Sequence, residues 1–344
     1  MWSRAPCLLQ IVFLIYVTIV TVKFTEAQNS QSPEERAVAF LSTEVPSWFS
    51  ENNCYSCHNN GDAARALYTA VSMAMPVEQG ALRDTTNWLR RPETWDDNAT
   101  RTEFNDRVLS RIQFSGALLA AIDARIIKDQ EPLLVAANLI AIEQKDDGSW
   151  RLDSSGSIGS PVTYGTALAT WGAMSVLKRV KSSELSTFVA KGEQWIREFK
   201  VKTVIDAAAI VLALGLAVDD AAHYQRQACL EIFLKGQAPS GGWGAYLKTP
   251  TEPFDTALVV LALSGLLNKS KLAEPSLDYK ELLRLIIDGR AFLLSQQLDN
   301  GSWLETTRPP GQQSYAQYIS TTGWSTLALL ATVDISATPV KTIR

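Results

Sequence analysis

The sequence predicts an all-α fold in which six helical hairpins close into a ring, and three observations predict it. First, one pattern occurs three times: Gln, three residues, Gly, one residue and Trp, at 144–150, 237–243 and 297–303. Second, each copy follows a stretch with one charged face and precedes a stretch that is apolar on nearly all sides, as surface and buried helices are. Third, almost no segment alternates polar and apolar residues with period two, so we expect little sheet.

The helices are expected to pair from one end of the domain to the other. The charged stretches belong in an outer ring and the apolar ones in an inner ring, because a closed double ring hides every apolar helix without leaving an end uncapped. Residues 33–335 are then one domain, in which 33–80 is a degenerate first hairpin and 130–335 holds the clear repeats. The expected outer and inner helices are 34–43 with 62–75, 80–91 with 105–127, 131–143 with 162–178, 186–199 with 203–217, 220–235 with 254–268, and 279–298 with 318–333.

The N-terminus has the composition of an export signal. Arg4 precedes a long apolar run, and Thr25 and Ala27 supply small residues for cleavage, so residues 1–27 are predicted to be a signal peptide. The apolar run is also close to the length that spans a bilayer, which leaves an uncleaved membrane anchor as the alternative. Both interpretations place the domain outside the cytoplasm, in the periplasm or the extracellular space.

Composition excludes one class of partner. Of the 344 residues, 46% are hydrophobic and 20% are charged, and the net charge is -4 without long blocks of like charge. A surface that follows a phosphate backbone needs an excess of basic residues, so nucleic acid is not an expected partner. Association with a membrane surface and the oligomeric state are left open by the sequence.

The three loops, together with "DTALVVLAL" after the second one, resemble the α/α toroid superfamily of squalene-hopene cyclases, other terpenoid cyclases and protein prenyltransferase β subunits. This resemblance implies an α/α toroid, an α6/α6 barrel with a central cavity. It implies structural loops in which each Gln caps and each Trp stacks between hairpins: Gln144, Trp150, Gln237, Trp243, Gln297 and Trp303. It also implies an apolar ligand, an isoprenoid or another lipid, in a cavity lined by Tyr164, Phe254, Asp255 and Trp324.

Cyclase chemistry needs an acid that can protonate an alkene. In squalene-hopene cyclases this acid is the middle Asp of a D-x-D-D-T-A motif, and Phe254 stands at its position in Glu252-Pro253-Phe254-Asp255-Thr256-Ala257. We therefore identify no catalytic residue and expect no cyclisation of squalene or of a prenyl diphosphate. The remaining candidate acids are Glu252, Asp255 and Asp206. Asp206 and Asp255 lie near the starts of inner helices, where a carboxylate also suits the helix dipole.

Two other features of the superfamily are missing. The chain has only two histidines, and His223 and Cys229 fall on different faces of one helix, so the zinc site of the prenyltransferases is not expected. The segment 191–194 reads Lys-Gly-Glu-Gln and lacks the cysteine of the thioester relatives. Gln194 and Trp195 are therefore interpreted as a degenerate repeat on an outer helix.

The first hairpin carries Cys54-Tyr55-Ser56-Cys57-His58 in a predicted loop. In an exported protein this spacing suits covalent haem attachment, with both thiols bonded to the vinyl groups and His58 as the proximal iron ligand. Two alternatives stay open: a Cys54–Cys57 disulfide or redox pair, and a zinc or iron site completed by a distant residue. Haem c is thus the candidate cofactor of this segment, with another metal as its alternative, and the rest of the chain predicts none.

Three functions remain compatible with these residues. The first is a toroid without catalysis that binds an apolar small molecule. The second is a redox protein that carries c-type haem on a toroid scaffold. The third is an active cyclase-like isomerase or transferase that uses a different acid, of which Asp206 is the first candidate. An acidic sugar substrate is a fourth, because toroids of this kind also process polysaccharides. The sequence does not decide whether the protein is an enzyme.

Overall fold

The computed structural model describes residues 31–98, 107–152, 160–215, 217–270, 279–308 and 313–336. These residues form helices, turns and loops and contain no strand, which confirms the all-α prediction. The predicted signal peptide, 1–27, lies outside the described residues. Within the described ranges, no helix has both the length and the apolar character that a membrane crossing requires.

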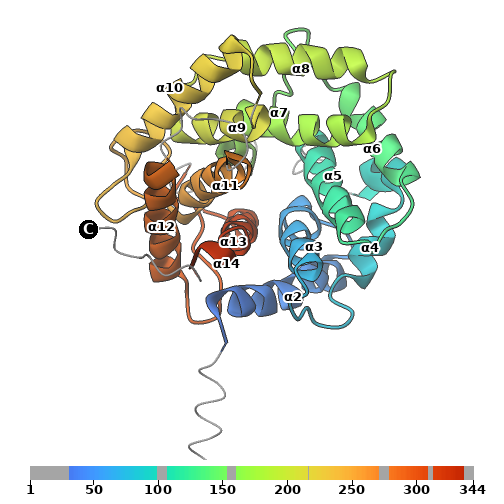
Figure 1. The fold of residues 1–344 in the computed structure, drawn as a ribbon. Coiled ribbons are helices and arrows are strands. Elements are labelled where there is room, and N and C mark those ends of the chain that lie inside the picture. Colours follow the sequence, from blue (N-terminus) through green and yellow to red (C-terminus); the bar gives the residue numbers. More distant parts are fainter. Residues whose placement is uncertain are drawn as a thin grey trace, which may run out of the picture.

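The helices form two concentric rings (Figure 1). Each inner helix contacts its neighbour along the chain, and α13 contacts α3, which closes the inner ring. A helix is present in each of the twelve predicted segments, and the toroid fold is confirmed, but α10, which was predicted to pair with α11, contacts mainly α9. The inner helices are α3 (Ala64–Ser72), α5 (Arg107–Asp123), α7 (Ser160–Val180), α9 (Val204–Leu214), α11 (Pro253–Ser270) and α13 (Tyr315–Leu330). The outer helices are α2 (Pro33–Asn52), α4 (Arg83–Leu89), α6 (Glu131–Ala141), α8 (Ser186–Glu198), α10 (Asp220–Gly236) and α12 (Tyr279–Gln296), and a short α14 (Val333–Ser336) follows α13.

The first two hairpins differ from their predicted boundaries. Helix α2 was expected to end at 43 but continues past Pro46 to Asn52. The first inner helix begins five residues early, as a π-helix, η1 (Cys57–Ala63), that runs directly into α3. Helix α4 is shorter than the predicted 80–91, and a 3₁₀ helix, η2 (Pro92–Asn98), follows it.

The early start of η1 has a local cause. The side-chain amide of Asn59 donates to the carbonyl of Glu44 at 2.8 Å, and that of Asn60 donates to the carbonyl of Val45 at 3.2 Å. Both carbonyls lie inside α2, directly before Pro46. The two asparagines thus bind η1 to the middle of α2, which no periodicity in the sequence indicates.

The three tryptophan loops have one common geometry. Each indole Nε1 donates at 2.8 Å to a carbonyl near the end of the preceding outer helix, and each Trp is 0% exposed. Each Gln donates from Nε2 to the carbonyl of its own loop glycine. The loops therefore satisfy their polar groups internally while they bury the largest apolar side chains. The indole contacts are Trp150 to Ile140, Trp243 to Phe233 and Trp303 to Leu293.

The third loop also closes the outer ring against α2. Gln297 donates to the carbonyl of Pro33 at 2.8 Å and accepts from Arg36 at 2.7 Å. Gly301 has a φ of +92°, and a Cβ there would lie 2.3 Å from the carbonyl oxygen of Arg36. A buried ion pair between Arg290 of α12 and Glu34 of α2 lies at the same junction. The two ends of the domain are thus joined by a loop whose glycine cannot carry a side chain.

Gly301→Ala is expected to destabilise the protein by at least about 2 kcal/mol, through the positive φ and the backbone clash with Arg36. Gly265→Ala is the matched control, because Gly265 lies within α11 and a Cβ there meets nothing within 4 Å. The control should be neutral or stabilising by about 0.5–1 kcal/mol. Urea unfolding of the two variants measures both values, and equal stabilities would contradict the account of ring closure.

Candidate functional site

Three aspartates begin inner helices in the same way. Asp62, Asp206 and Asp255 are each followed, two residues later, by an alanine: Asp62-Ala63-Ala64, Asp206-Ala207-Ala208 and Asp255-Thr256-Ala257. Their surroundings in the toroid nevertheless differ. The hydrogen-bond and charge partners of each carboxylate decide which of the three can act on a ligand.

Asp206 caps its own helix. Its carboxylate accepts from the backbone N–H of Thr203 at 3.2 Å, and its own N–H donates to the Thr203 hydroxyl at 2.9 Å. This reciprocal pair is a capping box at the start of α9. Burial raises the pKa of Asp206, while the hydrogen bonds with Thr203 lower it. The carboxylate is thus engaged at the helix terminus, as its predicted place near the positive end of the helix dipole suggests.

Asp255 and Glu252 share an arginine that the sequence does not point to. Arg308 donates to both carboxylate oxygens of Asp255, at 2.9 and 2.8 Å, and lies 3.0 Å from Glu252. Asp255 is 0% exposed and Glu252 only 7%. Burial raises the pKa of Asp255 to about 6, and Arg308 opposes that rise. Both acids are therefore buried in an ion network rather than exposed at a cavity mouth.

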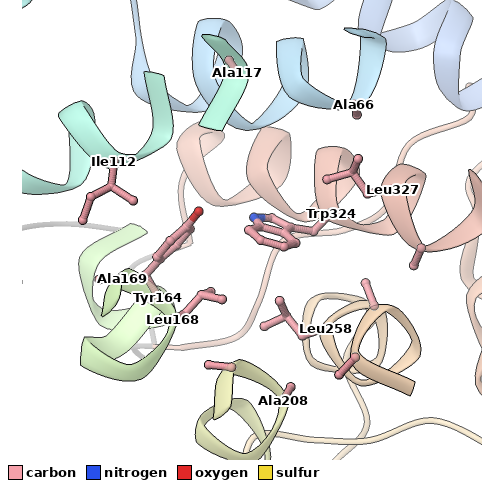
Figure 2. Packing of buried hydrophobic residues seen from close by; sticks show 14 of the residues in the cluster. Ala66, Ile112, Ala117, Tyr164, Leu168, Ala169, Ala208, Leu258, Trp324 and Leu327 are labelled. Carbon is pink, nitrogen blue, oxygen red and sulfur yellow. The ribbon is translucent and has the colours of Figure 1, made fainter. Parts of the chain in front are cut away.

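Aromatic side chains meet at the centre of the toroid. The ring of Trp324 lies 6.0 Å from Tyr164, 6.3 Å from Phe254 and 5.8 Å from Trp171, measured between centroids. Figure 2 shows Tyr164 of α7 beside Trp324 of α13, among aliphatic residues of the other inner helices. Tyr164 is 4% exposed and both Phe254 and Trp324 are 0% exposed. The three predicted lining aromatics thus lie together, but they fill space that was expected to be an open cavity.

Asp62 is a buried carboxylate at the edge of this aromatic cluster. It accepts a hydrogen bond from Nε2 of Gln113 at 2.6 Å and another from the hydroxyl of Tyr164 at 3.1 Å. Burial raises the pKa of Asp62 to about 6, although these hydrogen bonds and the nearby Arg65 lower it. The preceding Gly61 permits the approach, because a Cβ there would lie 2.8 Å from the Cβ of Gln113.

Arg65 lies one turn further along the same helix. Its guanidinium carbon is 4.9 Å from the centroid of Trp324 and 5.1 Å from that of Trp171, which is the geometry of a cation–π contact. Burial lowers the pKa of Arg65, while the neighbouring Asp62 raises it. Among the described residues Arg65 forms no ion pair and no hydrogen bond, so its N–H donors are available to a ligand.

A small cavity of about 40 Å³ lies against these groups. Its polar and aromatic lining residues are Asp62, Arg65, Gln113, Tyr164 and Trp171. The rest of the lining comes from α5 and α7, and both helices contribute a glycine: Gly116 and Gly172, with Ile112, Leu119, Ser175 and Val176. The volume suits a polar head group or a water molecule, not a long chain.

Sequence reasoning missed Asp62, Arg65 and Gln113. One signal was present, because "DAARAL" begins the first inner helix as "DTALVV" begins the fifth. The degenerate first hairpin obscured this match. No sequence signal pointed to Gln113. A single glutamine on an otherwise apolar helix is recognised as a site residue only when its partner, here the Asp62 carboxylate, is known.

The Cys-x-x-Cys-His segment lies partly outside its predicted loop. Cys54 follows α2, whereas Cys57 and His58 begin η1, and the two thiols are not joined. The His58 ring lies against Trp48 and Tyr315, with centroids at 5.1 and 5.8 Å.

The surroundings of His58 decide whether a haem would fit. Its Nε2, the nitrogen that would bind iron, has no accessible surface and no hydrogen-bond partner. Burial lowers the pKa of His58 to about 3. A porphyrin on Nε2 would have to displace the flanking aromatic rings, so these residues as placed do not fit a haem. The described residues also hold no group of three His, Cys, Asp or Glu side chains suited to a metal ion.

Asp62→Asn is expected to alter the pH dependence of stability. The Asp62 carboxyl has a pKa of about 6 in the folded protein, against an ordinary value of 3.8. The folded state therefore holds this proton more tightly, and stability is lost as the pH rises, by about 1–2 kcal/mol between about pH 5 and pH 7.5. Asn cannot titrate, so the variant's stability relative to wild type should rise by that amount over the same range in urea titrations. If the stability difference between the variant and wild type did not change with pH, the raised pKa of Asp62 would be contradicted.

Comparisons with known proteins support the fold. No family model matches the chain, and no curated protein matches it in sequence. A variant of the type II terpene cyclase MstE from Scytonema, in complex with geranylgeranyl dihydroxybenzoate, is similar in structure. The TM-score is 0.53 and the sequence identity is 14%, and the match covers 89% of this chain and 100% of that one. The ent-copalyl diphosphate synthase of Streptomyces platensis gives a TM-score of 0.51 and 15% identity over 78% of this chain and 49% of that one.

An inactive variant of an alpha-1,6-mannanase from Salegentibacter, in complex with alpha-1,6-mannotriose, is also similar, with a TM-score of 0.53 and 11% identity over 87% of this chain and 100% of that one. One toroid architecture therefore supports unrelated chemistries, and its residues rather than its fold must identify the ligand. The protein has an α/α toroid fold similar to that of these terpene cyclases and of the mannanase.

Proposed function

We propose that this protein binds an apolar, isoprenoid-class molecule whose oxygen-bearing end lies between Asp62 and Arg65. The observation that carries the proposal is the position of these two groups at a small cavity that Tyr164 and Trp171 also line, with Trp324 against Arg65. Arg65 can donate to a ligand hydroxyl or carboxylate, Asp62 can accept from a ligand hydroxyl, and the surrounding aromatic rings suit a hydrocarbon. The MstE structure, which holds a geranylgeranyl compound, supports the same ligand class.

The cavity holds only the polar end of such a molecule. The hydrocarbon chain would extend between α5 and α7, where Leu119 and Val176 line the cavity. Its length exceeds the space of about 40 Å³, so binding must move these side chains apart. Ile112 must also move, because it already packs against Gly172.

Binding is favoured over cyclisation by the position of Arg65. Cyclisation would require the Asp62 O–H bond to break as its proton forms a C–H bond with an alkene, which leaves a carboxylate and a carbocation. Aromatic faces could stabilise that cation, but Arg65 already lies over both Trp171 and Trp324. A second positive charge there would be repelled. Asp62 replaces Asp206 as the first candidate acid, and we propose that it orients the ligand instead.

The binding test compares three ligands of one chain length: geranylgeranoic acid, geranylgeraniol and phytane. Titrations followed by tryptophan fluorescence, with stoichiometry from native mass spectrometry, should show the acid bound most tightly and the alkane least. Arg65→Met should weaken binding of the acid by about tenfold or more, since a hydrogen bond to a charged group is lost. Arg179→Met is the control, because Arg179 pairs with Asp123 on the surface. Equal affinities for acid and alkane, or an unchanged Arg65→Met variant, would refute the proposal.

The same mixtures test for catalysis. Incubation with squalene or geranylgeraniol, followed by gas chromatography and mass spectrometry, should return unchanged substrate. A cyclic product that disappears in Asp62→Asn would show that Asp62 is a proton donor and that the protein is an enzyme.

We also propose that binding takes place outside the cytoplasm. The composition of residues 1–27, with Arg4 before an apolar run, supports export. Cell fractionation of the tagged full chain, with N-terminal sequencing of the product, tests both export and cleavage.

A further inference from the structure

A second hollow lies on the outside of the toroid, remote from Asp62 and Arg65. It has a volume of about 710 Å³ and is formed by the first tryptophan loop, the outer side of α8 and the turn that follows α8. This volume is in the range of small-molecule and oligosaccharide sites. Its lining residues are Asp146 and Asp147 of the loop, and Lys191, Gln194, Trp195, Glu198, Phe199, Lys200 and Lys202.

The two walls of this outer hollow are held in a fixed relation. A Cβ on Gly148 of the loop would lie 2.4 Å from the carbonyl oxygen of Lys191, and one on Gly192 would lie 2.3 Å from Sδ of Met174. Gln144 of the loop donates to the carbonyl of Phe188 in α8 at 2.8 Å. The hollow is thus formed before a ligand arrives, so little ordering is required on binding.

Two half-buried aromatic residues line the outer hollow. The rings of Trp195 and Phe199 have centroids 4.4 Å apart and planes inclined by 31°. Their neighbour Ile196 is 2% exposed, and the two rings pack partly against the core while they line the hollow. Aromatic rings at a polar surface hollow offer a flat face to the C–H side of a ring-shaped ligand.

The charges around these rings are unevenly neutralised. Lys191, Lys200 and Lys202 form no ion pair with any residue that the structure describes. Of the carboxylates, Asp147 pairs with Arg151, and Glu198 accepts from Gln194 at 3.0 Å. The outer hollow therefore presents unpaired ammonium groups beside carboxylate and amide acceptors.

We infer that the outer hollow binds an oligosaccharide that carries carboxylates, a uronate glycan. A pyranose ring would stack on Trp195, its carboxylate would pair with the unpaired lysines, and its hydroxyls would donate to Glu198 and Asp146. A polyphosphate or nucleic acid fits less well, because the carboxylates that suit hydroxyls would repel closely spaced phosphates. A neutral glycan would leave the lysines without partners.

Isothermal titration of the full chain with hexagalacturonate tests the inference, with maltohexaose as the neutral analogue. Hexagalacturonate should bind at low ionic strength and weaken as salt is added, whereas maltohexaose should bind at least about tenfold more weakly. Trp195→Ala should reduce the affinity about tenfold. Lys200→Ala combined with Lys202→Ala should also weaken binding and flatten its salt dependence.

Two controls match these variants elsewhere on the outer surface: Tyr224→Ala, which removes an aromatic residue that is 73% exposed, and Lys128→Ala. Both should bind hexagalacturonate as wild type does. The inference is overturned if hexagalacturonate does not bind, if the neutral glycan binds equally well, or if Trp195→Ala and the lysine variants bind as the controls do. Stronger binding of tripolyphosphate or of phosphatidylglycerol vesicles than of hexagalacturonate would also overturn it.

Discussion

Trp243→Ala is expected to lower the free energy of unfolding by about 4 kcal/mol. Trp243 is 0% exposed, and its Nε1 donates to the carbonyl of Phe233 at 2.8 Å. Its ring also lies against Gly289 of the next outer helix, where a Cβ would approach the ring to 2.8 Å. Truncation would remove a large buried surface, break the hydrogen bond to the Phe233 carbonyl and open a cavity between two hairpins.

Urea unfolding followed by far-ultraviolet circular dichroism measures this loss. Tyr224→Ala is the control, since Tyr224 is 73% exposed and its removal should change stability by less than about 0.5 kcal/mol. If the two variants were equally stable, Trp243 would not be the structural residue that the loop geometry indicates.

Arg308→Met is expected to destabilise the protein by about 3–5 kcal/mol near neutral pH, because it leaves buried carboxylates without their counter-charge. Asp255 loses two hydrogen bonds and Glu252 loses an ion pair. Arg308→Lys should be intermediate, since an ammonium keeps the charge but not the bidentate geometry.

The pH dependence identifies the cause of this loss. The pKa of Asp255 is already raised by burial to about 6, and removal of Arg308 would raise it further. In Arg308→Met the folded state then binds protons that the unfolded state releases, so the deficit should shrink as the pH falls towards about 5. Unfolding free energies at several pH values test this, and a constant deficit would mean that lost packing, not unpaired charge, is responsible.

The ring architecture follows from local features of the chain. The loops at 144–150, 237–243 and 297–303 each combine a capping Gln, a glycine at positive φ and a buried Trp. All three roles depend on neighbours close in sequence or on the next outer helix, so the repeated spacing located the loops and the family resemblance was sufficient to predict the roles of Gln and Trp. The first hairpin was harder, because its inner helix starts through contacts of Asn59 and Asn60 with carbonyls in the middle of α2.

The residues of the candidate site could not be predicted from sequence patterns. The alternation of amphipathic and apolar stretches was sufficient to predict two rings of helices, because burial of apolar surface acts on every repeat alike. It could not separate Asp62, Asp206 and Asp255, which open their helices with nearly the same residues. Their roles depend on partners far away in sequence: Gln113 and Tyr164 for Asp62, and Arg308 for Asp255. The desolvation and charge pairing that distinguish these carboxyls arise only when the ring closes, and tertiary structure alone decided them.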